Sequence, residues 1–240
     1  MDSQGKEPRS SSQQPFVPEG PSKVGFVQAF LARAAITALA LTVWFWSQSL
    51  IGKRTLTSGA TIGDGLHDLL APLNHFLHDQ TALADGLLIF SSGLIDLMGV
   101  FLLAVWLLGR STRPFLELVM VLGLRQIFQW LCQLPPPPDM IWHHPGFPSL
   151  LVTYGVSNDY FFSGHTAVAV LGAVELGRLG PRWLKAAGGA IVIFEIATVL
   201  ILRAHYTMDV FTGLVTALYV ATVAARLSPY FGRLLIGSPP

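Results

Sequence analysis

Residues 86–108 read GLLIFSSGLIDLMGVFLLAVWLL, a run that contains a single charged side chain, Asp96. A helix that crosses the hydrocarbon core of a bilayer needs roughly 20 mostly apolar residues. This stretch therefore predicts a transmembrane helix. The rest of the fold follows from similar stretches on either side of it.

Apolar runs of this kind occupy most of the chain. The 240 residues are 52% hydrophobic and 12% charged, with a mean hydropathy of +0.54, whereas a soluble domain is usually about a quarter charged. Helices satisfy their own backbone polar groups in lipid, so we expect an all-α, polytopic membrane bundle. Six transmembrane segments are predicted, at about 30–51, 86–108, 114–133, 163–179, 184–202 and 205–227.

The two ends of the chain differ from this apolar part. Residues 1–28 are rich in Ser, Pro, Gln and Gly, which predicts a disordered tail. Residues 29–228 are expected to form one membrane domain, and residues 229–240 a C-terminal tail. The first apolar run lacks a small-residue cleavage site and is expected to stay as an anchor. The net charge of +1 favours no nucleic-acid surface, and a single cysteine, Cys132, excludes an intramolecular disulfide.

The positions of Lys and Arg predict the orientation, because cytoplasmic loops hold the excess of these residues. With both termini cytoplasmic, the tails and inner loops contain eleven of them and the outer loops contain three. Residues 134–162, which begin with the stiff Pro135-Pro136-Pro137-Pro138, then face the lumen or the cell exterior.

Two further features are expected near the membrane interface. Residues 64–79 place leucines at helical spacing among Asp and His, which predicts an amphipathic helix in the interface, with His67, His75 and His78 on a solvated face. Five tryptophans near the ends of the predicted spans fit interfacial belts: Trp44, Trp46, Trp106, Trp130 and Trp142.

Two short polar strings begin the fourth and sixth segments, and the predicted orientation places both on the same side of the membrane. One is Ser163-Gly164-His165-Thr166 and the other is His205-Tyr206-Thr207-Met208-Asp209. His205 and Asp209 are four apart and share a helix face. The carboxylate can accept a hydrogen bond from one imidazole nitrogen and leave the other free to attack, as in a Ser-His-Asp triad with His as the nucleophile.

The first string is suited to bind phosphate. Ser163 is a preferred N-cap, Gly164 allows close backbone approach, and a helix N-terminus attracts anions. His165 can protonate a departing oxygen and later accept a proton. Arg125, within a predicted span, can clamp a phosphate with two hydrogen bonds, and Arg203 is a second candidate.

Structural alternatives remain for several of these residues. Arg125 can instead pair with Glu117 or Asp96 inside the bundle. Arg203 can extend to the interface as an ordinary cation, and Asp159 can be only a cap or a loop acceptor. The adjacent pair His143-His144 does not share a face, so a metal site there is disfavoured.

These motifs resemble the sphingomyelin synthase branch of the type 2 phosphatidic acid phosphatase superfamily, and the plant phosphatidylcholine:diacylglycerol cholinephosphotransferases are similar. Asn158-Asp159-Tyr160 is similar to a Gly-Asp-Tyr of sphingomyelin synthases, and Arg125 through Gln133-Leu134-Pro135 resembles their Arg-to-Leu-Pro stretch. The resemblance covers residues 120–226, and six spans with chemistry on the outer side also match.

The resemblance implies a mechanism without a metal or other cofactor. His205 would attack phosphorus and form a phosphohistidine, Asp209 would orient it, and His165 would exchange the proton. Phe162 stands where the soluble phosphatases of the superfamily have Pro, and Val199 where they have an Arg. These departures disfavour a simple phosphatase.

The sequence therefore predicts an integral membrane phosphotransferase that moves phosphocholine or phosphoethanolamine from a glycerophospholipid to ceramide or diacylglycerol. The expected catalytic residues are His165, His205 and Asp209. Phosphate or headgroup contacts are expected from Arg125, Ser163, Gly164, Asp159, Arg203 and Tyr206. Its partners would be membrane lipids, with a homo-oligomer left open. A lipid phosphatase or phospholipase C-like hydrolase is the first alternative, and a non-catalytic membrane protein the second.

Overall fold

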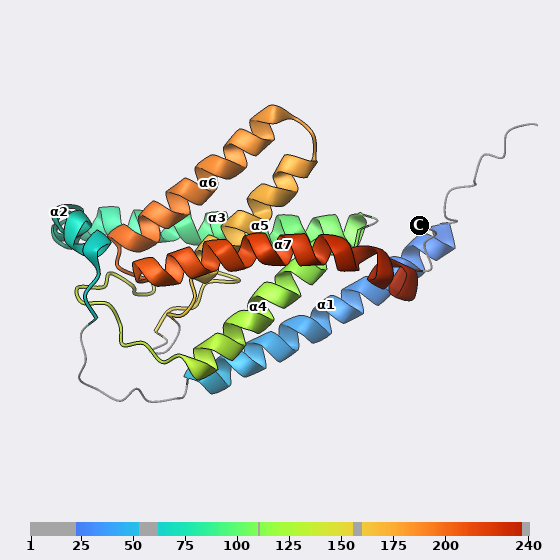
Figure 1. The fold of residues 1–240 in the computed structure, drawn as a ribbon, viewed down its shortest axis with the longest axis horizontal. Helices are drawn as coiled ribbons and strands as arrows, with labels where there is room; N and C mark the ends of the chain where they lie inside the picture. The colour runs from blue at the N-terminus through green and yellow to red at the C-terminus, as the bar shows by residue number, and fades with distance from the viewer. Residues whose placement is uncertain (1–22, 53–61, 110, 156–159, 237–240) are drawn as a thin grey trace, which may run out of the picture.

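The computed structural model describes residues 23–52, 62–109, 111–155 and 160–236. Within these residues the chain forms seven helices and no strand, which confirms the all-α prediction (Figure 1). The helices are α1 (Lys23–Gly52), α2 (Gly65–Asp79), α3 (Thr81–Leu108), α4 (Arg113–Leu131), α5 (Gly164–Arg178), α6 (Arg182–Ile201) and α7 (Thr207–Ile236).

Each of the six predicted segments is a helix, but in the described residues four are long and apolar enough to cross a membrane: α1, α3, α6 and α7. Helix α5 has 15 residues, and at about 1.5 Å per residue its length is about 23 Å, less than the roughly 30 Å hydrocarbon core. Helix α4 is longer but more polar, with Glu117, Arg125 and Gln129 buried along it. The protein is thus built as an integral membrane protein, and the six-span topology stays a prediction.

Helices α1 and α7 extend into the segments that were predicted to be tails. Helix α1 begins at Lys23, inside the range 1–28 predicted to be disordered, and residues 1–22 of that tail lie outside the described part. Helix α7 continues to Ile236, through most of the predicted C-terminal tail and past Pro229. Apolar residues on both sides of the predicted boundaries explain the longer helices.

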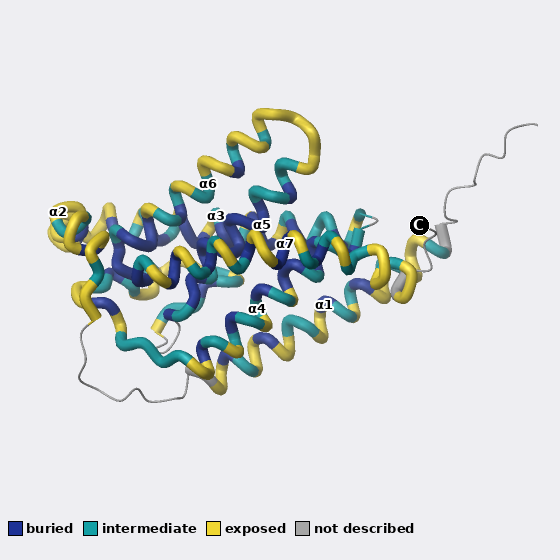
Figure 2. Tube along the Cα trace, viewed as in Figure 1, coloured by how far each residue is buried: buried dark blue, intermediate teal, exposed yellow. Residues whose placement is uncertain are grey.

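The core lies where α3, α4, α5 and α7 cross, as the buried segments in Figure 2 show. Small side chains at this crossing let the helices approach closely, as is common in membrane bundles. The cluster consists of Leu102, Leu118, Val121, Phe162, Ala167, Val170, Leu171, Ala217, Val220 and Ala221. This crossing fixes the start of α5 beside α7.

Helix α2 lies at one end of the molecule (Figure 1). Two of its polar side chains face inward, whereas Asp68, His75, His78 and Asp79 are exposed. His67 and Asn74 are buried, whereas Leu69, Leu73 and Phe76 are exposed. The exposed apolar face fits a helix that lies in the membrane interface. The expectation that His67 lies on a solvated face is therefore wrong.

The tryptophans divide between surface and interior. Trp46 and Trp130 are exposed, as an interfacial belt requires. Trp44 and Trp106 are buried, and Trp106 donates its indole N–H to Thr37 Oγ1 at 3.0 Å. The belt prediction is wrong for these two.

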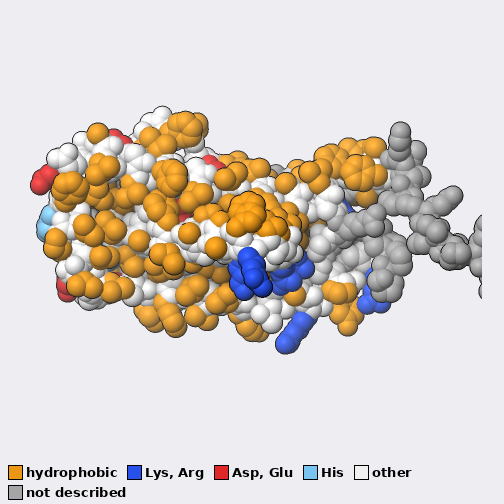
Figure 3. Space-filling model, turned by 90° about the horizontal axis from the view of Figure 1, so that it is seen from above, with side chains coloured by type: hydrophobic (Ala, Val, Ile, Leu, Met, Phe, Trp, Pro, Cys, Tyr) orange, Lys and Arg blue, Asp and Glu red, His pale blue; other side chains and the backbone are white. Residues whose placement is uncertain are grey.

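Charged side chains are unevenly distributed on the surface. Figure 3 shows a face covered largely by hydrophobic side chains. On this face the acidic and His side chains gather at one end, and Lys and Arg lie away from it (Figure 3). Such a separation is typical of a protein with a fixed orientation across a bilayer.

Candidate active site

The N-terminus of α5 lies against the first turn of α7. The backbone N–H of Ser163 donates to the carbonyl oxygen of Asp209 at 3.1 Å, and Ser163 Oγ accepts the N–H of Thr166 at 3.3 Å as the N-cap of α5. A Cβ at Gly213 of α7 would lie 2.6 Å from the Ser163 carbonyl oxygen. Glycine at that position therefore allows the two strings to meet.

Arg125 extends from α4 across this N-terminus. Its Nε donates to the carbonyl oxygen of Phe162 at 3.0 Å, and the side chain is buried. A Cβ at Gly164 would lie 3.0 Å from Arg125 Nε and 3.3 Å from Cζ. The guanidinium thus crosses directly over Gly164, the first residue of α5, at the N-terminal end of that helix.

The two acids considered as structural partners of Arg125 have other contacts. Asp96 accepts hydrogen bonds from residues 149–151 of the long, proline-rich loop between α4 and α5. Glu117 Oε1 lies 3.7 Å from Arg113 Nε, one turn earlier on α4. Arg113 in turn donates two hydrogen bonds to Glu175.

His205 has one ring nitrogen engaged. Its Nδ1 lies 2.8 Å from the carbonyl oxygen of Tyr160, which can only accept, so Nδ1 holds the proton. The nearest oxygen of Asp209 is 3.7 Å from the same nitrogen. A backbone carbonyl therefore sets the tautomer of the neutral ring, with the proton on Nδ1 and the lone pair on Nε2.

His165 lies on the opposite side of a small cavity. Its ring centroid is 6.5 Å from that of His205, so both rings can contact one small group between them. Its Nε2 is buried and has no hydrogen-bond partner. The ring of Trp142 meets it nearly edge-on, at 5.2 Å and 82°. An unpaired buried ring nitrogen is uncommon in a structural histidine.

Asp209 caps the helix that begins after His205. Its Oδ2 accepts the backbone N–H of Tyr206 at 2.9 Å, the N3-to-N-cap half of a capping box. Its Oδ1 is buried without a partner. The Tyr206 ring stacks on His67, and its hydroxyl donates to the carbonyl oxygen of Pro135 at 3.2 Å.

Arg203 ends α6 in the left-handed conformation, with φ of 54°. Its N–H donates to the carbonyl of Leu200 at 3.2 Å, and the N–H of Ala204 donates to that of Val199 at 2.9 Å. This pair of bonds defines a Schellman motif, in which glycine usually occupies the position of Arg203.

The guanidinium of Arg203 stabilises that strained position. It donates to the carbonyl of Pro138 at 3.1 Å, to Asp139 Oδ2 at 2.8 Å and to the carbonyl of His67 at 3.1 Å. These contacts direct it toward α2 and the proline-rich loop. The hydrogen bonds of Arg203 therefore fix the backbone segment that precedes His205.

The long loop after α4 is attached to α3. Asp96 accepts the N–H groups of Leu150 and Leu151 at 2.8 and 2.9 Å and the hydroxyl of Ser149 at 3.0 Å. One turn earlier on the same face of α3, the Ser92 hydroxyl forms a hydrogen bond with the hydroxyl of Tyr154. Non-helical backbone beside a spanning helix is tolerated where it is buried in protein or lines a cavity.

The same loop supplies part of the cavity wall. Trp142 donates its indole N–H to the carbonyl of Thr153 at 3.2 Å and faces His165. Neither Trp142 nor Asp96 was predicted from the sequence to belong to the site. A single acid in a long apolar helix is the signal that pointed to Asp96, since such a residue needs an interior partner.

Helix α2 supports the backbone at His205. His67 donates its Nε2–H to the carbonyl of His205, with an N···O distance of 3.0 Å. Asp64, the N-cap of α2, accepts both the N–H and the hydroxyl of Thr207 at 2.6 Å. Partial burial alone would raise the pKa of Asp64, but the hydrogen bonds from Thr207, together with the nearby His67, hold that pKa below its usual range.

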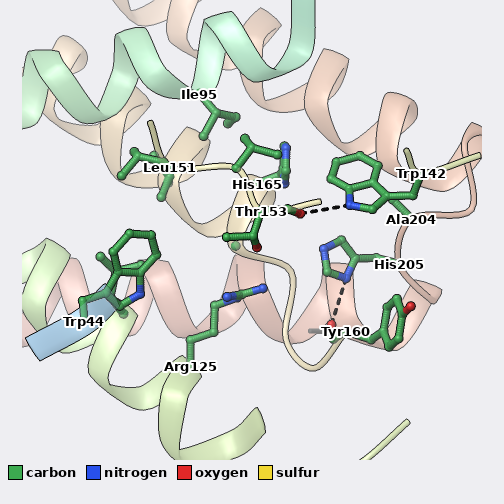
Figure 4. Close-up of a pocket in the computed structure, with 14 residues that line it drawn as sticks. Trp44, Ile95, Arg125, Trp142, Leu151, Thr153, Tyr160, His165, Ala204 and His205 are labelled. Atoms are coloured by element: carbon green, nitrogen blue, oxygen red, sulfur yellow. Dashed lines mark hydrogen bonds between the residues drawn. The ribbon is translucent and has the colours of Figure 1, made fainter. Parts of the chain in front are cut away.

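The side chains converge on a cavity of about 50 Å³ (Figure 4). Arg125, Gly164, His165 and His205 line it, and Figure 4 shows the two imidazoles and the guanidinium around the same space. Ser163 and Asp209 lie behind this wall, where they hold α5 and α7 together. Arg203 and Tyr206 contact α2 and the proline-rich loop, and Asp159 lies outside the described residues.

No group of three or more His, Cys, Asp or Glu side chains within the described ranges is close enough to hold a metal ion. The adjacent His143 and His144 have separate contacts. His143 pairs with Asp85 at 2.7 Å, and His144 Nδ1 accepts the N–H of Gly146.

Comparison with known families adds to this geometry. The family model AtPDCT1/2 matches residues 65–226, from the start of α2 to the later part of α7. The chain belongs to the AtPDCT1/2 family. Phosphatidylcholine:diacylglycerol cholinephosphotransferase 1 of Arabidopsis thaliana is 22% identical to it over 166 residues, which are 69% of this chain and 54% of the relative. The chain thus spans about half the length of the curated relative it matches.

The AtPDCT1/2 match includes both histidine strings, Arg125 and the loop held by Asp96. Helix α1 lies before it. The cavity between the histidines is therefore built almost entirely from the matched region, with Trp44 of α1 as the exception.

Proposed function

We propose that this protein is a membrane phosphotransferase that moves phosphocholine or phosphoethanolamine from a glycerophospholipid to a lipid alcohol, either diacylglycerol or ceramide. Membership of the AtPDCT1/2 family and the name of the Arabidopsis relative support a headgroup transferase. The observation that carries the mechanism is the pair of imidazoles, 6.5 Å apart, with Arg125 lining the same cavity.

In the first half-reaction the Nε2 lone pair of His205 attacks phosphorus. An N–P bond forms, and the P–O bond to the diacylglycerol oxygen breaks. His165 donates a proton to the departing alkoxide, so diacylglycerol leaves as a neutral alcohol. Arg125 and the N-terminal N–H groups of α5 stabilise the charge on the other phosphoryl oxygens.

In the second half-reaction a lipid alcohol takes the place of diacylglycerol. His165 accepts its hydroxyl proton while the alcohol oxygen attacks phosphorus. The N–P bond breaks, and its electron pair returns to His205 Nε2. Asp209 stabilises the imidazole while it carries positive charge, and Ser163 and Tyr206 position the two strings.

We further propose that the histidine cavity faces the lumenal or exoplasmic side, with both termini cytoplasmic, as the distribution of Lys and Arg favours. The resemblance to the type 2 phosphatidic acid phosphatase superfamily is consistent with this placement. Cysteine introduced at the exposed Phe147, in an otherwise cysteine-free chain made by Cys132→Ser, would react with an impermeant maleimide on the lumenal or exoplasmic side of sealed vesicles. Reaction only from the cytoplasmic side would reverse the topology.

The activity is tested with purified protein in mixed micelles that contain headgroup-labelled phosphatidylcholine and either diacylglycerol or ceramide. Label in a second phosphatidylcholine or in sphingomyelin supports the transferase, and His205→Ala should abolish it. Free phosphocholine without labelled lipid would show a phospholipase C-like hydrolase, which uses water in place of the lipid alcohol. Free phosphate from micelles that contain phosphatidic acid instead would show a phosphatase, which transfers an unsubstituted phosphoryl group to water. Absence of any His205-dependent product would favour a non-catalytic protein.

A further inference from the structure

A second, larger cavity lies beside the histidine cavity, between α1, α3, α4 and the loop held by Asp96. Its volume is about 450 Å³, which is within the roughly 300–1,000 Å³ typical of small-molecule sites. The lining is largely apolar and consists of Thr37, Ala40, Leu41, Val43, Trp44, Ser47, Gly99, Leu103, Phe115, Leu118, Val119, Leu122, Gly123, Gln126, Leu150 and Leu151. We call this space the α1–α4 cavity.

The two cavities are neighbours with common walls. Trp44, Leu122 and Leu151 line both of them. Figure 4 shows Trp44 beside Arg125 and Leu151 nearer His165, both on the side of the histidine cavity away from Trp142. A molecule with a polar group at the histidines can therefore extend past these three side chains into apolar surroundings.

The α1–α4 cavity also has the depth of one membrane leaflet. Its lining on α1 runs from Ser47, near the histidine end, to Thr37. Ten residues of helix rise about 15 Å, which is about half of the roughly 30 Å hydrocarbon core. An acyl chain attached to a headgroup at the histidines would follow the same direction.

Trp44 provides a separate sign of a ligand. Its side chain is buried, and its indole N–H has no hydrogen-bond partner. An indole N–H can only donate, and buried donors are nearly always paired. Because Trp44 lies where the two cavities meet, the missing acceptor would be a ligand atom at the boundary between a polar and an apolar part.

We propose that the α1–α4 cavity holds one acyl chain of a glycerophospholipid whose phosphate lies at Arg125 and the two histidines, with Trp44 donating to an ester carbonyl of that chain. The position of the phosphate rests on the proposed function. The acyl chain would form dispersion contacts with the apolar side chains that line the cavity. Helix α1, which lies outside the AtPDCT1/2 match, thus contributes a lipid-binding wall.

Photocrosslinking locates the chain without requiring turnover. His205→Ala protein is illuminated with phosphatidylcholine that bears a diazirine at the end of one acyl chain, and the labelled peptides are identified by mass spectrometry. Because the diazirine is at the chain end, we expect label at the end of the cavity far from the histidines, in residues 37–41, 103 and 115–119. Label confined to the membrane-facing sides of α6 and α7 would overturn the proposal.

A matched pair of glycines tests the cavity directly. A Cβ at Gly123, in the lining, or at Gly93, exposed on α3 outside the lining, would meet nothing within 4 Å. Gly123→Leu should lower crosslinking at least tenfold, whereas Gly93→Leu should leave it unchanged. Equal labelling of the two variants would show that the chain lies elsewhere. Trp44→Phe keeps the shape and should weaken labelling several-fold by removing the donor.

The two proposals fail in different ways. Crosslinks in the α1–α4 cavity without headgroup transfer would keep the acyl site and reject the transferase. Headgroup transfer with crosslinks elsewhere would keep the transferase and reject the acyl site. In active protein, Gly123→Leu should also reduce the rate with long-chain phosphatidylcholine more than the rate with a dihexanoyl donor.

Discussion

The Nδ1 of His205 lies 2.8 Å from the carbonyl oxygen of Tyr160, closer than the 3.7 Å that separates it from Asp209. A neutral carbonyl thus fixes the tautomer of the proposed nucleophile. The carboxylate, with its Oδ1 unpaired, is left to stabilise the ring once it becomes cationic. The two roles that the sequence assigned to Asp209 are therefore divided: the Tyr160 carbonyl orients the ring, and the carboxylate stabilises its positive charge.

This division predicts a moderate effect for Asp209→Asn. Asparagine keeps an oxygen that can accept the Tyr206 N–H, and the carbonyl of Tyr160 keeps the tautomer. Only the charge is lost, so we expect kcat to fall about 10²-fold, as for removal of one electrostatic contact. Loss of a triad carboxylate that sets the tautomer typically costs about 10⁴-fold.

Headgroup transfer by wild-type and Asp209→Asn protein, measured with melting temperatures in detergent, checks this. Asp209→Ala is the comparison that also removes the helix cap, and it should melt at a lower temperature. A fall of 10⁴-fold in Asp209→Asn at unchanged stability would mean that the carboxylate, and not the carbonyl, holds the ring.

Gly164→Ala should impair the site without unfolding the protein. The added Cβ would lie 3.0 Å from Arg125 Nε, so the guanidinium must shift by a few tenths of an ångström. A misplacement of 1 Å can cost about 10²-fold, so we expect kcat/KM to fall about 10-fold. Transfer assays over a range of phospholipid concentration measure the effect.

Gly177→Ala on the same helix is the control. Its Cβ would meet Lys185 Cγ at 3.7 Å, an ordinary contact. Both substitutions replace glycine in a helix, so a general effect of alanine would appear in both. Equal activity of the two variants would show that Arg125 does not act from its position over Gly164.

Arg203→Gly tests whether Arg203 stabilises the backbone before His205 or binds the lipid headgroup. Glycine relieves the left-handed strain, which costs about 1–2 kcal/mol, but it removes three hydrogen bonds of a charged group, each contributing about 1.5–3 kcal/mol. The net effect should be a lower melting temperature. The partner Asp139 is 57% exposed, so Asp139→Asn should change stability by only about 0–1 kcal/mol.

A headgroup role for Arg203 would give a different result. The melting temperature of Arg203→Gly would then stay the same or rise, while KM for the phospholipid would increase. Measuring both quantities on one preparation separates the two roles.

Sequence patterns predicted the helices well because long apolar runs have few alternatives in lipid. They also selected His165 and His205, which the fold places beside one cavity. The orientation of α2 was not predictable in this way. Leu69 and Leu73 face outward because the polar side chains of His67 and Asn74 find backbone carbonyls inside, at His205 and Ile201. Such partners depend on tertiary contacts.

The conformation of Arg203 and the attachment of the loop to Asp96 were missed for the same reason. Nothing near Arg203 in the sequence indicates a left-handed residue, since glycine is the usual signal for that position. Asp96 was recognised as an unusual intramembrane acid, but its partners at 149–151 lie more than fifty residues away. Local patterns do not contain such pairings.

The contact between Asp64 and Thr207 makes a pH-dependent contribution to stability. Hydrogen bonds from Thr207 lower the pKa of Asp64 in the folded protein, so the folded state favours the carboxylate more than the unfolded state does. The contribution is therefore complete above the unfolded pKa of about 4, and it disappears as pH falls through the lower folded value. Asp64→Asn should lower the melting temperature at pH 7 by an amount that stays constant down to pH 5 and shrinks below about pH 4.

Melting temperatures of the two proteins between pH 3 and pH 7 measure this difference. Asp68→Asn changes an exposed acid on the same helix and should have little effect across the range. Because Asp64 connects the start of α2 to the residue two positions after His205, the Asp64→Asn protein should also lose transfer activity at pH 7. Full activity with a lowered melting temperature would mean that α2 stabilises the fold without positioning the nucleophile.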